Sequence, residues 1–121
     1  MNFEDISIGT DIEKIERFEK YASDKEAPLI KRIFTDAEIE YCYSFKNPAE
    51  HLAVRFCAKE AVYKALGALG INDVDYCDVE VVRNSSGVPS VNLLKEKNID
   101  FRLSLSHGNG SAVANVIAIK K

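Results

Sequence analysis

The stretch RFCAKEAVYKALGALG, residues 55–70, decides how the rest of this sequence can be arranged. We predict that it is helical and that its helix begins upstream, where Asn47 and Pro48 form a cap followed by a first-turn proline. Gly67 and Gly70 both offer a residue at which a helix can end. The sequence therefore predicts one long helix that starts at Pro48 and ends next to one of these two glycines.

Near the N-terminus, the spacing of apolar residues changes within a few positions. Ile6 and Ile8 alternate with polar residues, which predicts a short strand that Gly9 then breaks. In DIEKIERFEKYA, residues 11–22, apolar residues recur at helical spacing, so we expect a helix there. Asp11 should therefore lie where the strand meets the helix, at or near the helix cap.

Between this segment and the long helix, residues 23–28 (SDKEAP) have the composition of a loop. Thr35 and Glu38 stand in capping-box register, which predicts a shorter helix from about residue 36 to residue 45. The first half of the chain is therefore expected to be mainly helical.

The second half of the chain has the period of strands. Residues 77–94 predict two strands around the turn RNSSG, in which Gly87 can take a positive φ. Residues 99–107 and 111–119 predict two more strands, joined by a tight hairpin loop at HGNG. Because helices come first and strands last, the fold class is predicted to be α+β, with a largely antiparallel sheet packed against the long helix and the shorter N-terminal helices.

Composition limits what the protein can be. A chain of 121 residues is expected to form one domain, residues 1–121. The net charge of -3 argues against nonspecific binding of nucleic acid, and no apolar run approaches the ~18 residues that cross a bilayer. The acidic N-terminal residues do not resemble an export signal, and three widely spaced cysteines are typical of reduced thiols. We therefore expect a cytoplasmic protein.

Glu60 is the first candidate for chemistry, because the predicted helix places it on one flank with Lys64 and Gly67. The structural interpretation is an exposed Glu–Lys pair at (i, i+4), worth only ~0.2–0.5 kcal/mol. The functional interpretation adds the cations Arg55 and Lys59 and the bare backbone of Gly67, which a ligand could approach closely. A carboxylate among cations can hold Mg²⁺ beside a polyphosphate.

Asp11 and His107 are the other candidates. Asp11 is either a helix cap or a hard oxygen ligand for Mg²⁺, and Glu13 is either a third ligand or a solvent-exposed side chain. His107 ends a predicted strand and precedes Gly108, so it could reach a phosphate without crowding.

Five motifs, in order and with appropriate spacing, resemble those of the holo-acyl-carrier-protein synthases of the 4′-phosphopantetheinyl transferase superfamily. They cover nearly the whole chain. The motifs are IGTDIEKIERF (8–18), FTDAE (34–38), LAVRFCAKEAVYKALG (52–67), SGVPSV (86–91) and LSLSHG (103–108). The third motif is the most specific of the five.

The resemblance implies an enzyme that transfers the phosphopantetheine arm of coenzyme A to a serine of an apo-acyl carrier protein, releases 3′,5′-ADP and serves fatty acid biosynthesis. It implies a homotrimer with active sites between subunits. The residues it implies are the Mg²⁺ ligands Asp11 and Glu60, the phosphate-binding Lys64, the cofactor-site residues Arg55, Lys59, Gly67 and His107 (the last from a neighbouring subunit), and Arg17 and Arg32 for carrier-protein docking. The general base is Glu60 or a metal-bound water that it orients.

Two other functions remain open from the residues alone. The first is another Mg²⁺-dependent enzyme acting on nucleotides or phosphoesters, although the sequence has neither a P-loop nor a GxGxxG motif. The second is a non-enzymatic oligomeric α+β module whose charged residues only solvate its helices. Release of 3′,5′-ADP would distinguish the transferase from the first, and stabilisation by coenzyme A would count against the second.

Overall fold

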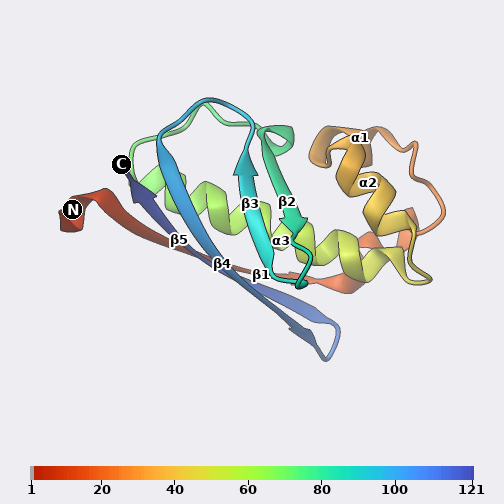
Figure 1. Ribbon diagram of the computed structural model, residues 1–121. Helices are drawn as coiled ribbons and strands as arrows, with labels where there is room; N and C mark the ends of the chain where they lie inside the picture. Colours follow the sequence, from red (N-terminus) through yellow and green to blue (C-terminus); the bar gives the residue numbers. More distant parts are fainter. Residues whose placement is uncertain (1) are drawn as a thin grey trace.

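The computed structural model describes residues 2–121 and confirms the α+β class. Figure 1 shows the long helix α3 lying across one face of an antiparallel sheet, with α1 and α2 packed near the start of α3. The elements in chain order are η1 (Phe3–Asp5), β1 (Ile6–Lys14), η2 (Ile15–Tyr21), α1 (Pro28–Ile33), α2 (Asp36–Tyr43), α3 (Pro48–Ala68), η3 (Tyr76–Asp78), β2 (Val79–Arg83), β3 (Pro89–Leu93), β4 (Ile99–Gly108) and β5 (Ser111–Lys120).

The long helix begins as predicted at Pro48, although the Asn47 side chain makes no capping hydrogen bond within the described residues. It continues through Gly67 and ends at Ala68. Gly70 has a φ of +80° and its N–H donates to the carbonyl of Gly67, while the next N–H, from Ile71, donates to Leu66. This paired pattern is a Schellman motif, so Gly70 rather than Gly67 terminates the helix.

The prediction for the N-terminal segment is wrong in one important respect. The first strand does not stop at Gly9 but runs to Lys14, and only Ile15–Tyr21 turns into a 3₁₀ helix. Asp11 consequently lies inside β1, opposite Ala114 of β5, and is not a helix cap. The short helix α1, in a segment partly assigned to a loop, was also missed.

The position of Gly9 inside this strand has a packing reason. A Cβ atom added there would lie only 1.9 Å from the backbone carbonyl oxygen of Ala61 in α3. The glycine is therefore a site of close backbone approach between β1 and α3, a second common reason for glycine inside a strand. Ala112, Ala114 and Ala118 of β5 are likewise buried against the helix, so small residues let it lie close to the sheet.

The strands form two separate antiparallel groups, ordered β1-β5-β4 and β2-β3. Both predicted turns are confirmed: Gly87 has a φ of +81° between β2 and β3, and Asn109 and Gly110 take positive φ in the turn of the β4–β5 hairpin. The capping box between Thr35 and Glu38 at the start of α2 is also present.

The outer face of the three-stranded sheet carries exposed aliphatic side chains on β1 and β5, whereas the outward side chains of β4 are polar. Because side chains alternate along a strand, β1 directs Ser7, Gly9 and Asp11 toward α3 and leaves its isoleucines on the opposite face. Ile8 is 75% exposed and Ile12 is 67% exposed. No helix within residues 2–121 is both long enough and apolar enough to cross a membrane.

Candidate active site

The site is built where β1 crosses α3. The Lys64 ammonium donates to the backbone carbonyl of Thr10 at 2.8 Å and to Asp11 Oδ1 at 3.2 Å. The Cys57 thiol, two turns earlier on α3, donates to the backbone carbonyl of Asp11. The structure thus brings the predicted Asp11 and Lys64 into contact, and Glu60 lies one turn before Lys64 on the helix.

Asp11 retains an unused oxygen. Its Oδ2 atom is buried and has no hydrogen-bond partner among the described residues. Glu13 lies two positions further along the same face of the strand. Burial and the Asp11 carboxyl raise the pKa of Glu13 to about 7, although the guanidinium of Arg17, 2.9 Å away, opposes this rise. Two neighbouring carboxyls of this kind form a site that favours a cation.

Glu60 does not form the exposed pair with Lys64 that helical spacing suggested. Its Oε1 instead accepts a hydrogen bond of 2.6 Å from the hydroxyl of Tyr76, on η3. Burial, followed by this bond and the charge of Glu60, raises the pKa of Tyr76 above its ordinary value. Lys64 bonds to β1 because the strand offers it both a carbonyl and a carboxylate. Sequence analysis did not identify Tyr76, because a residue outside the helix and sixteen positions away has no fixed spatial relation to Glu60.

The residues present can be compared with the needs of Mg²⁺. No cluster of three or more metal-binding side chains occurs within residues 2–121. However, Mg²⁺ usually takes only one or two carboxylates and keeps water or substrate phosphate at its other positions. The unpartnered Oδ2 of Asp11, the adjacent Glu13 and the half-buried Glu60 supply such hard oxygen donors. The donor set therefore fits this ion.

The prediction that Lys59 lines a cofactor site is wrong. Its side chain is fully buried and donates to Glu38 Oε1 at 2.8 Å, to the carbonyl of Tyr76 at 2.9 Å and to the carbonyl of Val79. Burial lowers the pKa of Lys59, while Glu38 opposes that change. Neighbouring residues of a helix point about 100° apart, so Lys59 faces the interior when Glu60 faces the crossing.

Arg55 is also buried, being 2% exposed, but not all of its hydrogen-bond donors have partners among the described residues. Its guanidinium lies 4.0 Å from the centre of the Tyr41 ring, and Nε and Nη1 have no hydrogen-bond partner among the described residues. It borders a cavity of about 210 Å³ that Arg83 also lines. Two free guanidinium donors beside a cavity favour an anionic ligand.

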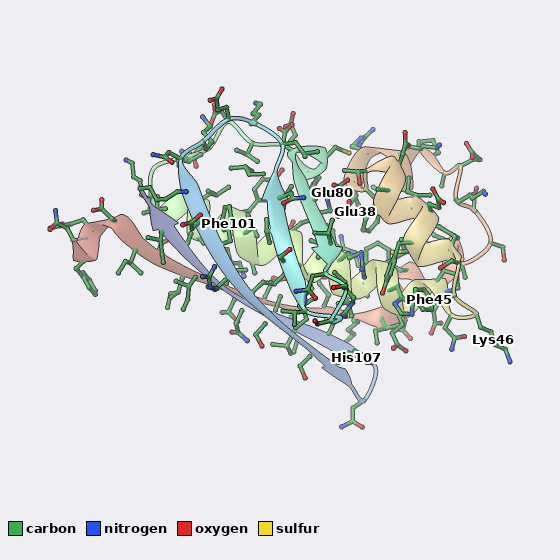
Figure 2. All side chains as sticks on the ribbon, in the orientation of Figure 1. Glu38, Phe45, Lys46, Glu80, Phe101 and His107 are labelled. Carbon is green, nitrogen blue, oxygen red and sulfur yellow. The ribbon has the colours of Figure 1, made fainter. Side chains whose placement is uncertain are left out.

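Of the remaining predicted residues, all of which the structure describes, only Arg17 is linked to the crossing, through Glu13. His107 is near the β4–β5 turn, where Figure 2 shows it at the lower edge of the molecule, and its Nδ1 is 3.3 Å from Glu50. Gly67 is exposed, with only the Asn72 side chain near a hypothetical Cβ, at 3.9 Å. Arg17 and Arg32 are exposed; Arg17 lies 4.9 Å from the centre of the Phe56 ring.

Comparison with known proteins agrees with this architecture. Residues 7–117 match the model of the 4′-phosphopantetheinyl transferase superfamily, and the chain belongs to that family. It is 45% identical to the holo-(acyl-carrier-protein) synthase of Geobacter sp. (strain M21), over 90% of this chain and 94% of the relative.

Two solved structures share the fold at appreciable sequence identity. One is a holo-(acyl-carrier-protein) synthase from Bacillus anthracis str. Ames in complex with CoA (3′,5′-ADP), with a TM-score of 0.79 and 31% identity over 95% of this chain and 96% of that one. The other is the Helicobacter pylori enzyme in complex with coenzyme A, with a TM-score of 0.77 and 32% identity over 92% of this chain and 98% of that one.

Proposed function

We propose that the protein is a single transferase domain, residues 1–121, that moves the 4′-phosphopantetheine group of coenzyme A to a serine of an apo-acyl carrier protein and releases 3′,5′-ADP. The observation that carries the proposal is Asp11, held against Lys64 at the β1–α3 crossing with one buried oxygen unpartnered. A carboxylate and an ammonium at one point suit a metal-bound diphosphate.

Asp11 and Glu60 would hold Mg²⁺, with Glu13 available as a further oxygen ligand. When bound, the ion supplies positive charge to the diphosphate oxygens. The Lys64 side chain is about half exposed, so its ammonium can turn from Thr10 toward a phosphate and balance the charge of the departing 3′,5′-ADP. Glu60 accepts the proton of the attacking serine, directly or through a water that it orients.

The two free donors of Arg55 would bind an anionic group of coenzyme A. Lys59 is given no such role, because all its donors are used internally. His107 would contribute from a neighbouring subunit, and Gly67 would permit close approach of the cofactor. Arg17 and Arg32 are exposed cations that suit an acidic carrier protein.

The exposed isoleucines on the outer face of β1 and β5 support the proposed homotrimer. Ile8 and Ile117 lie opposite each other on adjacent strands and border an open groove of about 600 Å³. An exposed aliphatic face of this kind is typical of an interface between subunits. We therefore propose a cytoplasmic trimer acting in fatty acid biosynthesis, and Ile8→Lys should shift its mass in light scattering toward that of the monomer.

The test of the function is intact-mass spectrometry of an apo-acyl carrier protein after incubation with the protein, coenzyme A and Mg²⁺. A gain of one phosphopantetheine, together with release of 3′,5′-ADP, is expected. The gain should be lost with EDTA and with Glu60→Ala, but should persist with Glu40→Ala, which removes an exposed acid on α2. No gain with several acidic carrier proteins, from folded protein that fails to bind coenzyme A, would reject the proposal.

The shared site has a separate test. Glu60→Ala and His107→Ala chains should each be inactive alone and should recover activity when mixed and reassembled, since some sites then combine an intact Glu60 with an intact His107. Mixed oligomers that form without any recovery would reject a contribution of His107 across the interface.

A further inference from the structure

We propose that Tyr76 is a positioning residue for Glu60, and that the buried Lys59–Glu38 ion pair holds Tyr76 in place. The proposal rests on the proposed function, in which Glu60 acts at the diphosphate. It assigns a role to the Tyr76 hydroxyl and to the buried Lys59–Glu38 ion pair, neither of which takes part in the reaction itself.

The first step of the argument is the bond between the two side chains. The Tyr76 hydroxyl donates to Glu60 Oε1 at 2.6 Å, a length typical of a hydroxyl bonded to a charged carboxylate. A glutamate on a helix surface otherwise has several rotatable bonds and little to fix its carboxylate. One strong donor therefore fixes Oε1 and leaves Oε2 for another partner.

The second step concerns the ring of Tyr76. It packs against Phe56, with 5.7 Å between ring centres, and against Tyr63, with 5.0 Å between ring centres in an edge-to-face arrangement. Phe56 and Tyr63 stand four positions before and three positions after Glu60, so both lie on the same flank of α3 as Glu60. The helix that carries the carboxylate thus also holds the ring that orients it.

The third step concerns the backbone of Tyr76. The fully buried Lys59 ammonium donates to the carbonyls of Tyr76 and Val79, the first residue of η3 and the residue directly after it. Lys59 uses its remaining donor on Glu38. The two bonds to these carbonyls hold η3 against α3 at both ends, and the third joins the ammonium to α2.

Glu38 is fixed in turn by main-chain donors. Its Oε1 accepts from the N–H of Thr35 at 2.9 Å, and its Oε2 accepts from the N–H of Val81 at 2.8 Å. Figure 2 shows Glu38 beside Glu80, between α2 and β2. The buried pair therefore connects α2, α3, η3 and β2, and Tyr76 is the one residue of this assembly whose side chain bonds to Glu60.

The experiment compares Tyr76→Phe with Tyr63→Phe. Each variant removes one hydroxyl and keeps a ring in the same cluster, but only the Tyr76 hydroxyl bonds to Glu60. In the transfer assay we expect Tyr76→Phe to lower kcat about tenfold or more, the usual effect of losing a hydrogen bond to a charged group. KM for coenzyme A should stay within twofold, and Tyr63→Phe should match the wild type.

Three kinetic results would overturn the proposal: a kcat for Tyr76→Phe within twofold of wild type, a loss seen only in KM, or an equal loss in Tyr63→Phe. A second readout does not need activity. With ¹³C at the tyrosine Cζ atoms, Glu60→Gln should shift the signal of Tyr76, assigned through its contacts with Phe56, and leave that of Tyr63 in place.

An unchanged Tyr76 signal in Glu60→Gln would overturn the proposal even if Tyr76→Phe does not fold. If the wild type transfers no phosphopantetheine, the proposed function fails by the mass assay, and the NMR measurement alone then decides whether Tyr76 holds Glu60.

Discussion

Replacing Gly9 with alanine should separate β1 from α3. The site depends on the packing of these two elements against each other, and most of that packing should be lost. The new Cβ would lie 1.9 Å from the carbonyl oxygen of Ala61, 2.9 Å from its carbonyl carbon and 3.0 Å from the amide nitrogen of Ala65. An ordinary contact begins at 3.4 Å, so strand and helix must move apart by about 1.5 Å.

The size of the effect follows from what must move. Overpacking a core costs typically about 1–3 kcal/mol, and here the obstructing atoms are backbone rather than flexible side chain. We expect the upper end, about 3 kcal/mol, which in a domain of this size lowers Tm by roughly 12 °C. The shift would also pull Asp11 away from Lys64, so transfer activity should fall with stability.

The assay is thermal unfolding followed by circular dichroism, with Gly67→Ala as the matched control. Gly67 is a helical glycine with open space around its hypothetical Cβ, so alanine should stabilise the protein by about 0.5–1 kcal/mol. A Tm for Gly9→Ala within 2 °C of wild type would refute the close approach as the reason for this glycine. In the same Gly67→Ala protein, an unchanged KM for coenzyme A would contradict cofactor approach at Gly67.

Three further predictions concern charged groups. Lys59→Met should lower the free energy of unfolding in urea by about 3–5 kcal/mol, because it leaves the Glu38 carboxylate buried without its cation. Adding Glu38→Gln should recover at least about 1 kcal/mol of that loss. No recovery would contradict a stabilising ion pair between Lys59 and Glu38. Between pH 4.5 and about 7, the folded protein keeps a proton on Glu13 that the unfolded chain has lost, because the pKa of Glu13 is raised by folding. In EDTA, the free energy of unfolding should therefore fall as pH rises. If Glu13→Gln does not flatten this pH profile, another group is responsible for it. Arg55→Lys should raise KM for coenzyme A about tenfold, since lysine cannot present two donors in one plane, and an unchanged KM in steady-state assays would exclude Arg55 from the cofactor site.

Local signals explain what could be predicted of the fold. The start of α3 at Pro48, its end next to one of two glycines and the turn at HGNG each depend on the conformational limits of one or two residues. The strands of the second half follow from alternation that a sheet with one buried face requires. These features need no knowledge of distant residues, and the structure confirms each of them.

Within the site, the sequence identified Asp11, Glu60 and Lys64 as candidates, but not how they are arranged. Their residue types suit a metal-bound diphosphate, and the two motifs that carry them resemble those of one family. The strand that presents Asp11 continues through Gly9 because it is paired with β5 from Ile6 to Lys14, and α3 can lie close against it only because position 9 has no Cβ atom to meet Ala61.

The tertiary structure alone decided which charges face the interior. Lys59 and Glu60 are adjacent in sequence, yet one is completely buried against Glu38 and the other is held by Tyr76. Arg55 is buried, and two of its guanidinium donors have no hydrogen-bond partner among the described residues. A buried charge is stable only where other segments of the chain supply its partners. These partners come together only when the chain packs, so no local stretch of sequence can identify them.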